Sequence, residues 1–197
     1  VAVVGPTASG KSDLAVRLAL KFNGEIVSAD SRQVYKGLDI GSGKITEQEM
    51  KGVPHYLLDV ADPQKIFTVD NYKILAEQAI EGTLERKKLP IIVGGTGFYI
   101  QAVVDGIAFP DVPPDENLRR ELENKTDEEL ILMLRERDPE RADHIDFHNR
   151  RRLIRAIEIT ETLGKVPPSV SKPKYRALFI GVEMGDKELK QKIKKRL

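Results

Sequence analysis

The sequence predicts an α/β protein in which helices cover both faces of a parallel sheet. Short apolar segments typical of buried strands alternate along the chain with amphipathic segments typical of helices. The strands are expected at 1–4, 25–28, 89–93 and 177–182, and the helices at 11–22, 70–87, 97–104 and 149–163. The turn between the first strand and the first helix fits G-x-x-x-x-G-K-[ST], a pattern that binds phosphate groups. Together these observations predict the three-layer fold of the P-loop NTPases.

The phosphate-binding turn is the run Gly5-Pro6-Thr7-Ala8-Ser9-Gly10-Lys11-Ser12. Its glycines let the backbone curl so that several N–H groups point inward, and the following helix adds the positive end of its dipole. Lys11 supplies a mobile cation, and the Ser12 hydroxyl is suited to holding Mg²⁺. The run therefore predicts nucleotide or other polyphosphate binding. It leaves open whether phosphate is transferred or departs as a leaving group.

The composition is that of a polar globular chain, with 40% hydrophobic and 32% charged residues among 197. The lack of cysteine excludes disulfides, thiol catalysis and Cys-ligated zinc. No apolar run is long enough to span a bilayer and no secretory signal is visible, so we expect no membrane contact. We further expect a cytoplasmic protein that is a monomer. The net charge of +1 means that any binding of nucleic acid requires a local basic patch.

A helical domain is expected to interrupt the α/β core. The Pro-rich run 109–115 opens a charged stretch in which Asp115 could cap a helix to about Glu123, and Thr126 could begin another. We therefore expect an all-helical insertion at 110–147 within an α/β core made of 1–109 and 148–197. The alternative is a helical excursion packed on the same core.

Two further loops are expected beside the phosphate-binding turn, because ligands lie beyond the carboxyl ends of parallel strands. This rule places 5–12, 29–34 and 94–99 in one crevice. Asp30 could bind Mg²⁺, act as a general base or cap the next helix. The run 94–97 has three glycines around Thr96, which allow close approach to a ligand or simply form a tight turn. The strand at 89–93 lacks a terminal Asp and the chain lacks Asn-Lys-x-Asp, which weakens the ordinary ATPase and GTPase interpretations.

Arginines crowd the start of the predicted helix at 149–163. They are Arg150, Arg151, Arg152 and Arg155. Positive charge at a helix N-terminus opposes the helix dipole, so a compensating anion is expected, and nucleic-acid phosphate is the natural candidate. The alternative is a solvated face paired with Asp143, Asp146 and Glu158.

Several separated motifs, taken in order, resemble the tRNA dimethylallyltransferase (tRNA isopentenyltransferase, or IPP transferase) family. The motifs are the phosphate-binding turn at 5–12, Ser-Ala-Asp-Ser-Arg-Gln-Val-Tyr at 28–35, Gly-Leu-Asp-Ile-Gly at 37–41, Val-Pro-His-Tyr-Leu-Leu-Asp at 53–59, Gly-Gly-Thr-Gly-Phe-Tyr at 94–99 and Arg-Arg-Leu-Ile-Arg-Ala-Ile-Glu at 151–158. They span most of the chain. Family members are longer, so the resemblance implies that the C-terminal part is missing here.

The resemblance implies transfer of a dimethylallyl group from dimethylallyl diphosphate to N6 of an adenosine beside a tRNA anticodon. The phosphate-binding turn would then hold a departing diphosphate, with Mg²⁺ on Ser12. Asp30 matches the family's general base, Thr96 a residue between the amine and the diphosphate, and Arg119 an arginine that contacts the reaction centre. The segments that match tRNA contacts are Asp30-Ser31-Arg32-Gln33 and Arg151-Arg152-Leu153-Ile154-Arg155. The alternatives are an adenylate isopentenyltransferase, which acts on a free nucleotide, and a P-loop kinase of small molecules or nucleotides.

Overall fold

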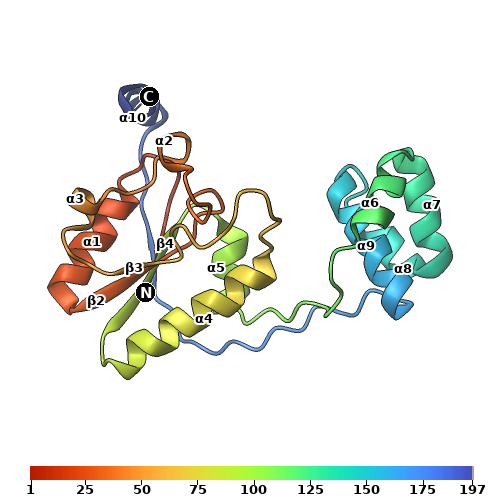
Figure 1. Cartoon of the computed structure of the whole chain (residues 1–197), viewed down its shortest axis with the longest axis horizontal. Coiled ribbons are helices and arrows are strands. Elements are labelled where there is room, and N and C mark those ends of the chain that lie inside the picture. The colour runs from red at the N-terminus through yellow and green to blue at the C-terminus, as the bar shows by residue number, and fades with distance from the viewer. Residues whose placement is uncertain (197) are drawn as a thin grey trace. The chain divides into compact units, whose positions relative to one another are not determined.

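The computed structural model describes residues 1–196, and only the backbone of Asp186, Lys195 and Arg196. Leu197, the last position of the expected α/β core, lies outside the described residues. The elements in chain order are β1 (Ala2–Val4), α1 (Lys11–Phe22), β2 (Gly24–Ser28), α2 (Asp39–Ser42), α3 (Glu47–Met50), β3 (His55–Tyr56), α4 (Val69–Glu85), β4 (Leu89–Gly94), α5 (Gly97–Val104), α6 (Glu116–Glu123), α7 (Asp127–Arg137), α8 (Pro139–His144), α9 (Arg150–Leu163), β5 (Phe179–Gly181) and α10 (Asp186–Arg196) (Figure 1).

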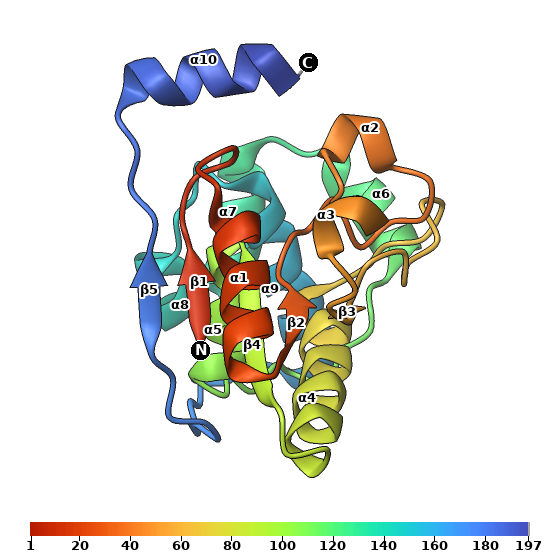
Figure 2. The same ribbon diagram turned by 90° about the vertical axis from the view of Figure 1, so that its left-hand side faces the viewer.

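The strands form one sheet in the order β3-β2-β4-β1-β5, and every neighbouring pair is parallel (Figure 2). Val3 of β1 stands opposite Val93 on one side and Ile180 on the other. The predicted α/β fold with a parallel sheet is thus confirmed. The sequence did not predict β3, which pairs with β2 through only two residues.

Side chains of alternate strand residues pack into two cores, one on each face of the sheet. Val3, Ile26 and Ile91 pack with the buried face of α1. Val27 and Ile92, their neighbours along the strands, pack with α4 and α5 on the other face. The period of two in a strand produces this division, and it gives the three layers of a P-loop NTPase-like fold.

The chain divides into two compact units, one of which is helical. The α/β unit contains Val1–Ile107 and the chain from Ser171 onward, and the helical unit is Ala108–Val170. The helical unit therefore includes more residues than the expected insertion at 110–147, chiefly at its C-terminal end. The difference is α9, because Leu153 and Ile157 are fully buried in the same cluster as Leu130 and Leu134 of α7.

The expected helix starts in this unit are confirmed. The Asp115 side chain accepts hydrogen bonds from the backbone N–H groups of Asn117 and Leu118, and so caps α6. Thr126 forms a reciprocal capping box with Glu129 at the start of α7.

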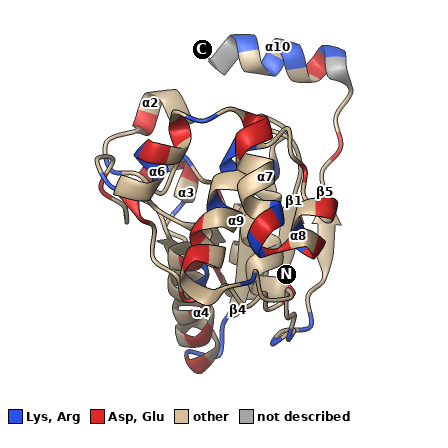
Figure 3. Cartoon of the chain, turned by 90° about the vertical axis from the view of Figure 1, so that its right-hand side faces the viewer, with Lys and Arg blue, Asp and Glu red and all other residues tan. Residues whose placement is uncertain are grey.

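Figure 3 shows basic and acidic residues interleaved over α7, α8 and α9. No helix within residues 1–196 has both the length and the apolar character needed to cross a lipid bilayer.

The two chain segments that connect the units lie side by side. Ala108 N donates to Val170 O at 2.9 Å, and Lys172 N donates to Gly106 O at 3.2 Å. Ile107 and Ser171 form an antiparallel bridge between them. A Cβ on Gly106, which has a φ of +61°, would lie 2.0 Å from Lys172 O, so only glycine permits this approach.

Candidate active site

The phosphate-binding turn connects the end of β1 to the start of α1. A Cβ on Gly5 would lie 2.7 Å from Val182 O, beyond the end of β5, so glycine is required for the turn to pass that strand. Gly10 caps α1 with a φ of +90°, in the left-handed region that favours glycine. Lys11 is almost completely buried, and its Nζ donates to Pro6 O at 3.2 Å. The lysine is thereby held across its own turn.

The loops that follow β2 and β4 are joined by backbone and side-chain hydrogen bonds. Ala29 N donates to Val93 O at 2.8 Å, and Thr96 N donates to Ala29 O at 3.1 Å. Ser31 N donates to Thr96 Oγ1 at 3.0 Å. Because this oxygen is used as an acceptor, the Thr96 hydroxyl hydrogen remains available to a second partner.

A pocket of about 40 Å³ lies where the three loops predicted to converge come together. Its lining residues are Thr7, Ala8, Lys11, Ser12, Ile26, Ser28, Asp30, Gln33, Ser42, Ile45, His55, Leu58, Val93 and Gly94. Lys11, Ser12 and Asp30 line the pocket, as the sequence predicts. A second cleft of about 490 Å³ adjoins the same turn and shares Ala8, Lys11 and Ser12 with the pocket, and Glu49 and Lys51 also line it, together with Gly10.

Asp30 is fixed by the turn that it begins. Its Oδ1 accepts hydrogen bonds from Arg32 N at 2.9 Å and Gln33 N at 3.3 Å. One oxygen of the carboxylate therefore stabilises the local backbone in an Asx-type turn. The helix cap that the sequence left as an alternative does not form, because residues 31–34 form turns and not a helix. Burial raises the pKa of Tyr99 to about 12, and the negative charges of Tyr35 and Asp30 add to the shift.

Oxygen donors at the pocket suit a hard divalent cation. Ser12 and Asp30 both line it. Over the part of the chain that the structure describes, no three His, Cys, Asp or Glu side chains cluster as metal ligands. Mg²⁺ is commonly held by one or two protein oxygens together with water and substrate phosphates, and this donor set fits that pattern.

His55 is a pocket residue to which sequence reasoning gave no individual role. Its Nδ1 lies 2.7 Å from Val53 O, which selects the tautomer with the proton on Nδ1. Its Nε2 is buried and has no hydrogen-bond partner among the described residues. Burial lowers the pKa of His55 despite the contact with Val53. His55 thus lines the pocket as a neutral imidazole. The motif at 53–59 was the signal in the sequence that could have identified it.

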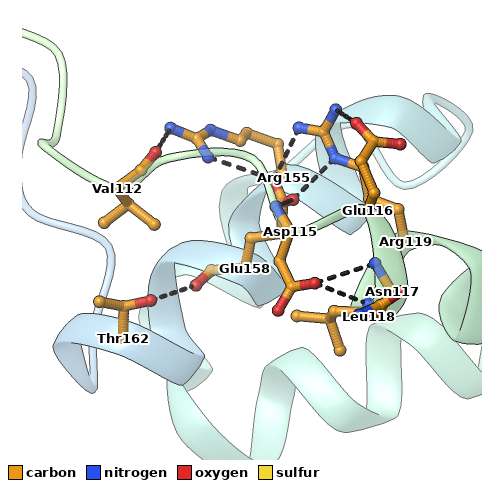
Figure 4. A network of polar contacts seen from close by, with 9 residues as sticks. All are labelled: Val112, Asp115, Glu116, Asn117, Leu118, Arg119, Arg155, Glu158 and Thr162. Carbon is orange, nitrogen blue, oxygen red and sulfur yellow. Dashed lines mark hydrogen bonds and ion pairs between the residues drawn. The ribbon is translucent and has the colours of Figure 1, made fainter.

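Arg119 lies in the helical unit and is bound to a buried carboxylate. Its Nε and Nη2 donate to the two oxygens of Glu158 at 2.7 and 2.9 Å (Figure 4). Arg155 Nη1 donates to Glu158 at 3.2 Å, and its Nη2 donates to Val112 O at 2.8 Å. One carboxylate thus binds both Arg119 and Arg155. The sequence had assigned Arg119 to the reaction and Arg155 to tRNA binding.

The other arginines of α9 have different surroundings. Arg150 Nη2 donates to the carbonyls of Leu122, Glu123 and Lys125, and so caps the C-terminal end of α6. Arg152 pairs with Asp146 at 3.7 Å, whereas Arg151 is exposed. The alternative interpretation, in which these arginines pair with nearby carboxylates, is therefore correct for Arg152 with Asp146 and for Arg155 with Glu158.

The expected tRNA contact of Leu153 and Ile154 needs correction. Their side chains are 0% and 7% exposed and belong to the apolar core of the helical unit. They project inward because they lie on the apolar face of α9. The surface of this segment is formed by its arginines.

Comparisons with known proteins give one consistent result. A family model described as IPP transferase matches residues 33–197. The chain is 43% identical over 202 residues to a tRNA dimethylallyltransferase of Anoxybacillus flavithermus, covering 100% of this chain and 65% of that protein. A tRNA dimethylallyltransferase of Leuconostoc citreum is 43% identical over 196 residues, covering 100% of this chain and 66% of that protein. The chain thus spans about two thirds of the length of these relatives.

Solved structures agree with the sequence matches. The full-length tRNA isopentenylpyrophosphate transferase of Bacillus halodurans superposes with a TM-score of 0.66 at 42% identity, over 99% of this chain and 63% of that one. A eukaryotic dimethylallyltransferase acting on tRNA superposes with a TM-score of 0.85 at 30% identity, over 99% of this chain and 50% of that one.

Proposed function

Because the chain belongs to the IPP transferase family, we propose that its protein transfers a dimethylallyl group from dimethylallyl diphosphate to N6 of an adenosine beside a tRNA anticodon. The observation that carries the proposal is the convergence of a phosphate-binding turn with Asp30, in the pocket, and with Thr96, which is bonded to the loop of Asp30. A leaving-group cradle, a base and a hydroxyl donor are the parts that such a transfer requires.

In the proposed reaction the N6 nitrogen attacks the allylic carbon as the carbon–oxygen bond to diphosphate breaks. Asp30 accepts the proton that N6 loses. Its Oδ1 is occupied by two backbone N–H groups, so we assign the proton to Oδ2. The Thr96 hydroxyl, whose oxygen accepts from Ser31 N, donates its hydrogen to a diphosphate oxygen beside the amine.

The phosphate-binding turn stabilises the departing diphosphate. The residues assigned to it are Gly5, Pro6, Thr7, Ala8, Ser9, Gly10, Lys11 and Ser12. The backbone N–H groups of these residues, other than Pro6, and the Lys11 ammonium stabilise the negative charge that develops on the bridging oxygen. Ser12 would hold Mg²⁺, which when bound supplies positive charge to the diphosphate oxygens.

We assign tRNA contacts to exposed and half-buried groups of both units. In the α/β unit these are Ser31, Arg32 and Gln33, next to Asp30. In the helical unit they are Arg151, Arg152 and Arg155, and the resemblance to the family assigns Arg119 a part in the reaction. We place the protein in the cytoplasm as a monomer. The target adenosine must leave its stack to reach the pocket, as base-modifying enzymes require.

The experiment combines the full-length protein with Mg²⁺, dimethylallyl diphosphate and unmodified tRNA, and detects prenyl adenosine by mass spectrometry. Asp30→Asn keeps an oxygen for the turn but removes the base, and it should lower kcat by about 10²- to 10⁴-fold. Asp62→Asn is the matched control, because Asp62 Oδ1 accepts from Gln64 N at 2.9 Å in a similar exposed turn. Product from free adenylate but not from tRNA would favour the adenylate isopentenyltransferase. Rapid ATP turnover without prenyl transfer would favour the kinase.

A further inference from the structure

Glu158 on α9 is the centre of a polar network inside the helical unit (Figure 4). It is 2% exposed. Its Oε1 accepts from Asp115 N at 2.9 Å and from Arg119 Nε at 2.7 Å. Its Oε2 accepts from Arg119 Nη2 at 2.9 Å and from Arg155 Nη1 at 3.2 Å. An ionised carboxylate has about four acceptor positions, and the donors around Glu158 fill them.

Two carboxylates and two guanidinium groups make up this network. Burial alone would raise the pKa of Glu158, but hydrogen bonds from Arg119, Asp115 and Arg155 bring it below its ordinary value. The carboxylate is therefore ionised at neutral pH and faces two guanidinium groups. Glu116, whose Oε1 lies 3.9 Å from Arg119 Nη1, supplies the second negative charge.

The hydrogen bonds of Arg119 come from one edge of its guanidinium. Nε and Nη2 bind Glu158 side-on, a bidentate arrangement that fixes the plane of the group. Nη1 lies 3.9 Å from Glu116 Oε1, beyond hydrogen-bond distance. The Arg119 side chain is 24% exposed. Nη1 thus forms the edge whose N–H groups Glu158 leaves available.

We propose that Glu158 is a positioning residue that orients Arg119, so that its Nη1 edge meets a phosphate oxygen of the substrate. The proposal rests on the proposed function, in which the helical unit contacts tRNA. The phosphate oxygen belongs to the tRNA backbone, which a guanidinium can bind through the N–H groups of one edge. A fixed plane matters because a misplacement of about 1 Å at a reacting centre can cost about 10²-fold in rate.

Glu25 offers a matched control in the α/β unit. It is also 2% exposed and pairs with Arg86 at 2.6 Å and Lys88 at 2.9 Å. It also accepts from the hydroxyls of Tyr56 and Thr83. None of these residues lines the pocket between the loops. Removing the charge of Glu25 therefore disturbs a similar buried network without a positioning role.

The experiment is a double-mutant cycle on the full-length protein with tRNA and dimethylallyl diphosphate. Glu158→Gln and Arg119→Ala should each lower kcat/KM by about 10- to 100-fold, and the double variant should lose little beyond Arg119→Ala alone. Glu25→Gln should lower the thermal midpoint but change kcat/KM by less than about 2-fold. Both single variants should raise the KM for tRNA and leave the KM for dimethylallyl diphosphate unchanged, and a rise confined to the KM for dimethylallyl diphosphate would overturn the assignment to the tRNA backbone.

A variant can lose activity because it unfolds or because Arg119 is no longer oriented. Circular dichroism measures the folded fraction of each variant, and kcat is divided by this fraction. Glu158→Asp keeps the charge on a shorter side chain and should recover part of the activity lost in Glu158→Gln. Multiplicative losses in the double variant, or an equal loss in Glu25→Gln, would overturn the positioning role while leaving the proposed function in place. A wild-type protein that forms no prenyl adenosine would overturn the proposed function itself.

Discussion

Gly94→Ala is the substitution that the geometry of the pocket opposes most directly. Gly94 ends β4 beside the loop that carries Asp30. A Cβ built on it would lie 2.0 Å from Ala29 O and 2.3 Å from Ala29 C. Both atoms belong to backbone, so no side chain can move away to make room.

The size of the effect follows from the distance. Real Cβ contacts do not fall below 3.0 Å, so a gap of 2.0 Å must widen by at least 3.0 − 2.0 = 1.0 Å. The separation would strain the hydrogen bonds from Thr96 N to Ala29 O and from Ser31 N to Thr96 Oγ1. Displacing Thr96 from Asp30 by about 1 Å should lower kcat by about 10²-fold, and the strain should cost about 1–3 kcal/mol of stability.

Prenyl transfer and urea denaturation of the full-length protein test this reasoning. Gly181→Ala is the control, because a Cβ at that position in β5 has no neighbour within 4 Å and Gly181 has no positive φ. It should leave both measurements close to wild type. A wild-type kcat in Gly94→Ala would contradict this reasoning. It would show that the close contact between Gly94 and Ala29 is not needed to position Thr96 relative to the loop of Asp30.

Three further predictions concern stability. Hydrogen bonds from Arg86 and others lower the pKa of Glu25 from 4.5 to about 2. The free energy of unfolding therefore falls as the pH falls from about 5 to 2. The shift corresponds to an upper limit of about 3 kcal/mol, and solvent around the half-exposed Arg86 reduces the loss below this limit. Urea midpoints of Glu25→Gln should depend less on pH across this range, and parallel curves would contradict the assignment. Leu153→Ala should destabilise the helical unit by about 2–5 kcal/mol in calorimetry while leaving diphosphate binding by the α/β unit intact. Arg150→Ala leaves three carbonyls without their cap and should cost about 1–3 kcal/mol by urea denaturation.

The elements that could be predicted are those with a strong local signal. Short apolar segments located β1, β2 and β4, and cap residues located the starts of α6 and α7. β3 has two residues and no alternation to detect, so it depends on its pairing with β2. The apolar face of α9 was visible, but periodicity identifies a buried face and not the element that covers it. This is why α9 was expected in the α/β core.

The candidate site was predictable where a rule of the fold places residues together. The carboxyl ends of parallel strands meet, so the convergence of the loops at 5–12 and 29–34 followed from the sequence. The pairing of Arg119 with Glu158 did not, because these residues are 39 positions apart and no local pattern joins them. The role of His55 was hidden for a similar reason. Its unpartnered Nε2 becomes apparent only when β3 is placed beside Ile26.

The paired segments at 106–108 and 170–172 affect how the α/β unit can fold. β5 joins the sheet beside β1, and the whole helical unit lies in the chain between α5 and β5. If that chain were unstructured, closing it would cost entropy that grows with its length. Once the helical unit has folded, Ala108 and Val170 are held one hydrogen bond apart. For the α/β unit, the folded insertion then acts as a short connection, comparable to a hairpin turn. Pairing of β5 with β1 therefore requires closing only a short loop.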